Sequence, residues 1–126
     1  MANRTELSSW QALAQHAQTL RTQKIKDLFA EDQARFDKFS LQLPHFLFDY
    51  SKNLITEETQ SLLLALAEEV DVAGWRDRMF AGEHLNRTED RAVMHVALRD
   101  KSGKPIMIDG QDVRPVVEGE LKRMRA

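Results

Sequence analysis

Apolar side chains recur every three or four residues near the start of this chain, which is the spacing of an amphipathic helix. The first such stretch covers residues 8–20, where Ser8 has capping-box spacing and Trp10 is expected to pack inward. Residues 25–39 repeat Ile, Leu and Phe in the same way, with a break at Asp32. The pattern therefore predicts three helices before residue 40, with core phenylalanines.

Two other stretches have the pattern of short strands joined by tight turns. Residues 40–43 alternate apolar and polar side chains, and residues 46–50 do so less cleanly, on either side of Pro44-His45. This predicts a hairpin with His45 exposed at its turn. The segment "PIMIDGQDV" contains Asp109-Gly110, the composition of a type I′ turn, between two short predicted strands. The sequence therefore predicts two small β-hairpins.

Three more helices are predicted between and after these hairpins. Thr56 with Glu57 and Glu58 is a good N-terminus for a helix that ends near Val70 and buries a leucine stripe. Asp71 caps the next helix, which ends at Gly82 and is expected to turn Val72, Trp75, Met79 and Phe80 inward. Asp112 caps the last helix, with Pro115 in its first turn.

The segment "NRTEDRAVMHVALR" predicts a buried helix over residues 88–99, capped by Thr88. Arg91, His95 and Arg99 would then lie on one line of this helix, and apolar residues would cover most of the remaining surface. One interpretation makes the line an anion site in which His95 is an acid or base. We favour the other, in which all three residues bond neighbouring segments, because buried polar groups are normally paired.

These elements predict an α+β fold that is mainly helical with two short β-hairpins. The last helix has neither a C-cap glycine nor a following element to cover its apolar positions. The sequence thus predicts one incomplete segment, residues 1–126, of a larger protein.

Composition excludes several classes of function. The chain has 126 residues, 18 basic and 20 acidic, and neither sign forms a long block, which argues against a nucleic-acid partner. The absence of cysteine excludes disulfides and thiolate chemistry. The longest apolar run, "LLLALA", is too short to span a bilayer, and the first residues do not form a signal peptide. We therefore expect a cytoplasmic protein without a membrane partner.

The remaining candidate chemistry is weak. Ser51 and Lys52 could grip a phosphate, but no glycine-rich turn follows them, so loop capping is favoured. Glu57 and Glu58 are adjacent on a helix and do not face each other, so they are not a catalytic pair. Histidines 16, 45, 84 and 95 lack metal-ligand spacing, and no P-loop, dinucleotide fingerprint or nucleophile elbow occurs. We expect no metal and no cofactor.

Residue by residue, the chain resembles the N-terminal part of the glucose-6-phosphate isomerase family. The resemblance rests on four segments in the same order and at similar spacings, of which the third is the most distinctive: "LFAEDQARFDKFSL", "DYSKNLITEET", "MFAGEHLNRTEDRAVMHVALR" and "PIMIDGQDVRP". The connection between Leu41 and Phe46 is shorter than the family usually has.

The resemblance implies an enzyme that interconverts an aldose phosphate and a ketose phosphate through an enediol(ate), as a homodimer of α/β sugar-isomerase subdomains without a cofactor. It also implies that the phosphate loop, the glutamate base, the enediolate-stabilising arginine and the ring-opening histidine and lysine lie outside this sequence. We therefore assign no catalytic, substrate-binding, cofactor or metal residue here, and expect the chain alone to be inactive. The alternative is a stand-alone, non-catalytic binding or scaffolding module derived from the same family.

Overall fold

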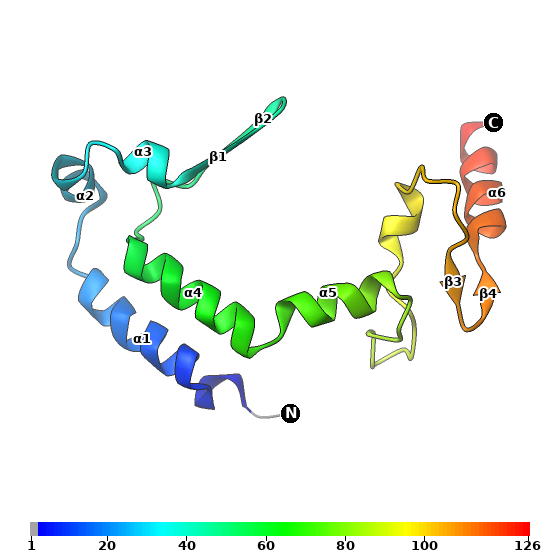
Figure 1. Ribbon diagram of the computed structural model, residues 1–126, viewed down its shortest axis with the longest axis horizontal. Helices are drawn as coiled ribbons and strands as arrows, with labels where there is room; N and C mark the ends of the chain where they lie inside the picture. The colour runs from blue at the N-terminus through cyan, green and yellow to red at the C-terminus, as the bar shows by residue number, and fades with distance from the viewer. Residues whose placement is uncertain (1–2) are drawn as a thin grey trace. The chain divides into compact units, whose positions relative to one another are not determined.

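The computed structural model describes residues 3–126, which divide into two compact units, Met1–Val70 and Asp71–Ala126 (Figure 1). Unit 1 contains a short 3-10 helix, four α-helices and one hairpin: η1 Arg4–Glu6, α1 Ser8–Leu20, α2 Ile25–Glu31, α3 Arg35–Lys38, β1 Ser40–Leu43, β2 Phe46–Asp49 and α4 Glu57–Glu69. Unit 2 contains α5 Val72–Phe80, η2 His95–Leu98, β3 Met107–Ile108, β4 Gln111–Asp112 and α6 Arg114–Arg125. This confirms an α+β fold with two antiparallel hairpins.

Helices α1 and α4 pack against each other in antiparallel directions (Figure 1). At one end, the Ser9 amide donates to Glu69 Oε2 at 2.9 Å, and the hydroxyls of Ser8 and Ser9 also donate to this carboxylate. At the other end, Nε2 of the buried His16 lies 2.7 Å from the Thr59 hydroxyl. Polar contacts of this kind at both ends fix the register of the two helices.

Two details predicted for α1 are wrong. Ser8 is the first residue of the helix rather than its N-cap, which is Leu7 and makes no side-chain bond. The Ser8 hydroxyl instead binds Glu69, a partner 61 residues away that local sequence spacing cannot reveal. Trp10 is 40% exposed and does not belong to the core of unit 1.

The start of α4 confirms the predicted cap. The Thr56 hydroxyl accepts from the Thr59 amide, and the Thr59 hydroxyl accepts from the Thr56 amide, which closes a reciprocal capping box. Glu57 and Glu58 occupy the first turn, where they complement the helix dipole. The leucine stripe is less buried than expected, since Thr59 is the buried residue of this helix and Leu63 is exposed.

The first hairpin is anchored at its base by Arg35, whose side chain is buried at the start of α3. Its guanidinium donates to the carbonyls of Ser51 and Asn53, both at 2.8 Å, and lies over the rings of Phe29 and Phe39. Cation–π contact and charged hydrogen bonds together stabilise this junction. The predicted core phenylalanines are confirmed for Phe39, whereas Phe36 is exposed.

Unit 2 begins with the predicted cap, since the Asp71 carboxylate accepts from the Gly74 amide. Gly82 follows the C-cap of α5 with φ +80°, as predicted, but Val72 and Phe80 are exposed rather than inward. In the second hairpin, Asp109 and Gly110 have φ 50° and 77°, the positive values that a type I′ turn requires. Asp112 precedes the N-cap of α6, Val113, and accepts from the Arg114 amide.

The helix predicted over residues 88–99 does not form. Asn86 and Arg91 instead pair as an antiparallel bridge, each amide donating to the other's carbonyl at 3.1 Å, and a single 3-10 turn begins at His95. Within the bridge loop, the side chain of Asn86 accepts from Thr88 and donates to Glu89. Short polar side chains that hydrogen-bond to nearby groups compete with helix formation. In this segment those hydrogen bonds form and the predicted helix does not.

Candidate functional site

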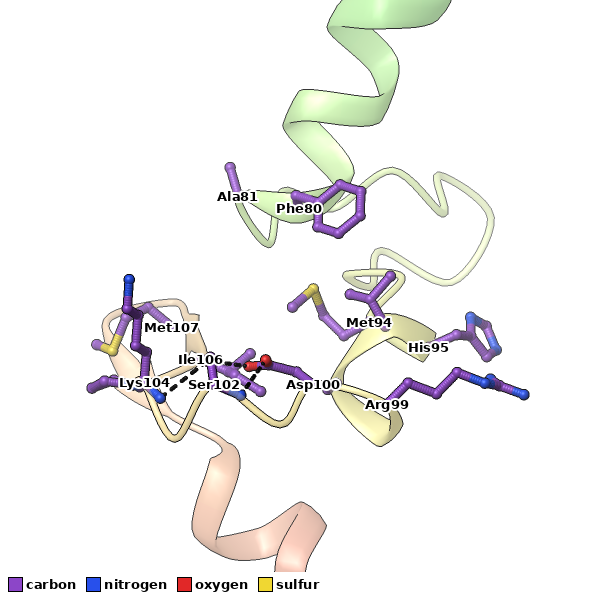
Figure 2. A pocket seen from close by; sticks show the side chains of 13 residues that line it. Phe80, Ala81, Met94, His95, Arg99, Asp100, Ser102, Lys104, Ile106 and Met107 are labelled. Carbon is purple, nitrogen blue, oxygen red and sulfur yellow. Dashed lines mark hydrogen bonds between the residues drawn. The ribbon is translucent and has the colours of Figure 1, made fainter. Parts of the chain in front are cut away.

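Unit 2 contains an open hollow of about 810 Å³ between the end of α5, the 3-10 turn η2 and the segment that leads into β3. Its lining is largely apolar: Phe80, Met94, Val96, Ala97, Ile106 and Met107 (Figure 2). Ala97 and Ile106 are buried, whereas Phe80 and Met107 are exposed. The hollow is therefore an apolar depression whose rim carries polar groups.

The carboxylate in this lining is already committed to structural bonds. Asp100 accepts from the Ser102 amide and hydroxyl at 2.8 and 2.9 Å, two of the contacts drawn in Figure 2, and it also pairs with Arg114. The Ser102 amide, then its hydroxyl, and the Arg114 guanidinium hold the pKa of Asp100 below its usual range. An ionised carboxylate with these partners is a loop anchor rather than a general base.

The expected line of Arg91, His95 and Arg99 does not exist, because the helix that would align them is absent. Arg91 belongs to the bridge with Asn86, while His95 and Arg99 lie on the rim of the hollow, and all three residues are exposed. Figure 2 shows the His95 and Arg99 side chains projecting away from Asp100 and Ser102. Within residues 3–126 the three side chains make no hydrogen bond or ion pair with the protein, so the expected structural bonds are also missing.

Ser51 and Lys52 occupy a loop rather than an anion cradle. Ser51 is buried, its amide and hydroxyl both bind Asp49 Oδ1, and its carbonyl accepts from Arg35. Lys52 pairs with the other oxygen of Asp49 at 3.2 Å. The Ser51 hydroxyl and amide, followed by Lys52, lower the pKa of Asp49. These contacts support the loop-capping interpretation.

The predicted separation of Glu57 and Glu58 is confirmed, because each contacts a different partner. Glu57 lies 3.3 Å from Lys38, which also pairs with Asp32 at 2.9 Å. Glu58 lies 3.4 Å from Nδ1 of His16. Both carboxylates are exposed and make separate ion pairs within unit 1, so among the described residues they do not converge on a common point where a substrate could react.

The other three histidines have three different environments. His16 is buried between α1 and α4, and His45 is exposed at the first hairpin turn with φ 67°. His84 lies between two carboxylates, with Nδ1 3.0 Å from Asp90 and Nε2 3.0 Å from Asp109. Hydrogen bonds to Asp90 and then Asp109 raise the pKa of His84. In the part of the chain described, no group of three His, Asp or Glu side chains could hold a metal ion.

Three polar residues that join distant segments were not predicted from the sequence: Arg35, His84 and Arg114. Arg114 binds Asp100 and the carbonyl of Lys104, and it lies 3.7 Å from Glu118. Local spacing carries no signal for such residues, because Asp109 lies 25 positions from His84 and Asn53 lies 18 positions from Arg35.

None of the helices described between residues 3 and 126 has the length and apolar character needed to cross a membrane. Among the described residues, the candidate site is an apolar hollow in which no acid, base and anion cradle converge. The polar side chains around it, such as Asp100, stabilise loops.

The chain is similar to known proteins of one family. Residues 49–126 match the family model described as phosphoglucose isomerase. Three curated relatives are similar over 98–99% of this chain: the glucose-6-phosphate isomerase of Pseudoalteromonas translucida (strain TAC 125) at 46% identity, glucose-6-phosphate isomerase 1 of Colwellia psychrerythraea (strain 34H / ATCC BAA-681) at 51%, and the glucose-6-phosphate isomerase of Methylococcus capsulatus (strain ATCC 33009 / NCIMB 11132 / Bath) at 50%. The chain spans 23% of the length of each relative.

Proposed function

Because the chain belongs to the phosphoglucose isomerase family, we propose that it is the N-terminal scaffold segment of an enzyme that interconverts glucose 6-phosphate and fructose 6-phosphate. In this reaction a base moves a proton between C1 and C2 of the open sugar through an enediol(ate). The full-length enzyme would act in glycolysis and gluconeogenesis in the cytoplasm, as a homodimer of α/β sugar-isomerase subdomains, without a cofactor. Residues 1–126 form one segment of that fold.

The observation that carries the scaffold role is that the carboxylate of the hollow is held by structural bonds, while the His95 and Arg99 side chains on the rim, unbonded within residues 3–126, project away from it. Proton transfer on a sugar phosphate needs a free base, an anion cradle and a charge stabiliser that converge on one pocket. In the hollow of unit 2 the Asp100 carboxylate is held by Ser102 and Arg114, and the remaining lining is mostly apolar. The reacting groups of the proposed enzyme are therefore assigned to the part of the family protein that this chain does not span.

A chimera tests this proposal. The 125 matched residues of the Methylococcus capsulatus relative would be replaced by this chain, and isomerisation of fructose 6-phosphate would be followed in a dehydrogenase-coupled assay. We expect the chimera to be active and the 126-residue chain alone to be inactive. The unmodified relative provides the reference activity.

Two outcomes would contradict the proposal. One is a folded chimera without turnover, which would favour the alternative of a non-catalytic binding module that no longer supports the enzyme. The other is turnover by the chain alone that scales with its concentration and survives removal of contaminating isomerase.

A further inference from the structure

The hairpin β1–β2 has one face made entirely of apolar side chains. The strands pair Leu41 with Phe48 and Leu43 with Phe46, and directly paired residues point to the same face of a sheet. The opposite face carries the pairs of Gln42 with Leu47 and of Ser40 with Asp49. We name the first the hairpin face: Leu41, Leu43, Phe46 and Phe48.

The hairpin face continues the core of unit 1. Phe39 and Tyr50 lie two positions from Leu41 and Phe48, so they belong to the same side of the hairpin. They flank the hairpin face at the base, where the Tyr50 amide donates to the Phe39 carbonyl. Phe39 is 2% exposed, and its ring meets the Tyr50 ring edge to face with centroids 5.9 Å apart. The ring centroids of Tyr50 and Phe48 are 5.3 Å apart. One continuous apolar row therefore begins inside unit 1 and runs out along the hairpin.

Beyond this base the row is uncovered. Leu41, Leu43 and Phe46 are each 57% exposed, and Phe48 is 51% exposed. Figure 1 shows the hairpin extending away from α3. A hairpin of two strands is at best marginally stable without a packed face, and a contiguous exposed apolar patch marks a contact surface.

We propose that the hairpin face is the docking site for an apolar surface in the remaining part of the phosphoglucose isomerase chain. This inference rests on the proposed function. The chain spans 23% of its relatives, so a protein of their length supplies more than enough chain to cover the face. The hairpin face bears no charge, so its complement is an uncharged, apolar helix or sheet face rather than a nucleic acid or a charged peptide.

Thiol labelling tests the docking directly, because the sequence contains no cysteine. Leu43→Cys places a thiol on the hairpin face, and Leu47→Cys is its matched control on the opposite face of the same hairpin. Leu47 is 48% exposed, so both thiols start from similar accessibility. Each variant would be made in the 126-residue chain and in the Methylococcus capsulatus chimera, with the chimera lacking the new thiol as the blank.

We expect both thiols to react rapidly with a maleimide in the chain alone. In the chimera, the rate for Leu43→Cys should fall by about tenfold or more, which corresponds to about 1.4 kcal/mol of protection, whereas the rate for Leu47→Cys should stay close to its value in the chain alone. This pattern would support docking through the hairpin face.

Three outcomes would overturn the proposal. Equal labelling of Leu43→Cys in both contexts would mean that the remaining chain does not cover the face. Protection in the chain alone at every concentration would place the cover within this chain. Protection that disappears on dilution would identify a second copy as the occupant. Activity of the chimera is recorded separately, so an inactive chimera that still protects Leu43→Cys would refute the proposed function and leave the docking intact.

Discussion

At the scale of single residues, the most informative side chains are polar groups that join segments distant in sequence. Arg35 ties α3 to the loop after β2, and Arg114 ties α6 to the loop before β3. Arg35 satisfies the buried carbonyl of Ser51, which would be costly to leave without a donor, and Arg114 joins more exposed groups. Such arginines are structural, and their charge is not evidence of an anion site.

His84 gives a pH prediction at this scale. Both ring nitrogens can donate to the flanking carboxylates only when the imidazole is protonated, which is why Asp90 and Asp109 raise its pKa. A raised folded-state pKa stabilises the fold fully below the unfolded value of 6.5, and this contribution is lost as the pH rises through the folded-state pKa. Tethering of the loop to the second hairpin should therefore weaken as the pH rises through the raised pKa of His84.

A proton NMR titration of the His84 ring checks this prediction. We expect Asp109→Asn to lower the pKa of His84, and Asp37→Asn, in the other unit, to leave it unchanged. An unaltered His84 titration in the Asp109→Asn variant would show that the carboxylate does not bind the ring.

At the scale of elements, the sequence predicted those whose signals are local. The Thr56 N-cap of α4, the break at Asp32 and the Asp-Gly turn were all predicted correctly, because each depends on residues within four positions of one another. The segment 88–99 has an equally clear helical pattern and yet forms a bridge and a 3-10 turn. Its outcome depends on the bonds of Asn86 and on His84 binding Asp90, which periodicity does not encode.

Gly82 and Gly119 allow two predictions of opposite sign about the free energy of unfolding. A Cβ on Gly82 would lie 2.6 Å from the Met107 carbonyl oxygen, and its φ of +80° is unfavourable for any other residue. We expect Gly82→Ala to lower the free energy of unfolding by about 1–3 kcal/mol. Gly119 lies inside α6 with open space around it, so Gly119→Ala should raise this free energy by about 0.5–1 kcal/mol.

Urea unfolding of the two variants, followed by circular dichroism, measures both effects. Opposite shifts of the unfolding midpoint are expected. A Gly82→Ala protein as stable as the parent would show that the loop after α5 does not pack against β3 as closely as described.

At the scale of the whole molecule, each unit has a small core and a large apolar surface. Leu28 and Phe39 are the buried apolar residues of unit 1, and Ala97 and Ile106 are those of unit 2, among the residues described. Outside residues 88–99, the sequence predicted the amphipathic helices correctly but not how little of their apolar faces would be covered. Periodicity shows which side of a helix is apolar, whereas the partner that covers it is a property of the complete fold.

The exposed apolar surface predicts how the chain behaves alone. We expect the 126-residue chain to bind a hydrophobic dye such as ANS and to unfold with low cooperativity, because small cores give marginal stability. In the Methylococcus capsulatus chimera, dye binding per molecule should fall. A monomeric chain with a sharp thermal transition and no dye binding would contradict this expectation.

The exposed hairpin also has a consequence for the synthesis of the protein on the ribosome, where the chain emerges from its N-terminus. If the chain is the N-terminal quarter of its family protein, the hairpin leaves the ribosome before the surface that covers it exists. The 125 matched residues are 23% of the Pseudoalteromonas relative, so about 420 residues remain, which take about 20–80 s at translation rates of roughly 5–20 residues per second. During this interval Leu41, Leu43, Phe46 and Phe48 present an uncharged, strand-forming patch to other nascent chains. The nascent hairpin is thus one segment whose aggregation a ribosome-associated chaperone would prevent.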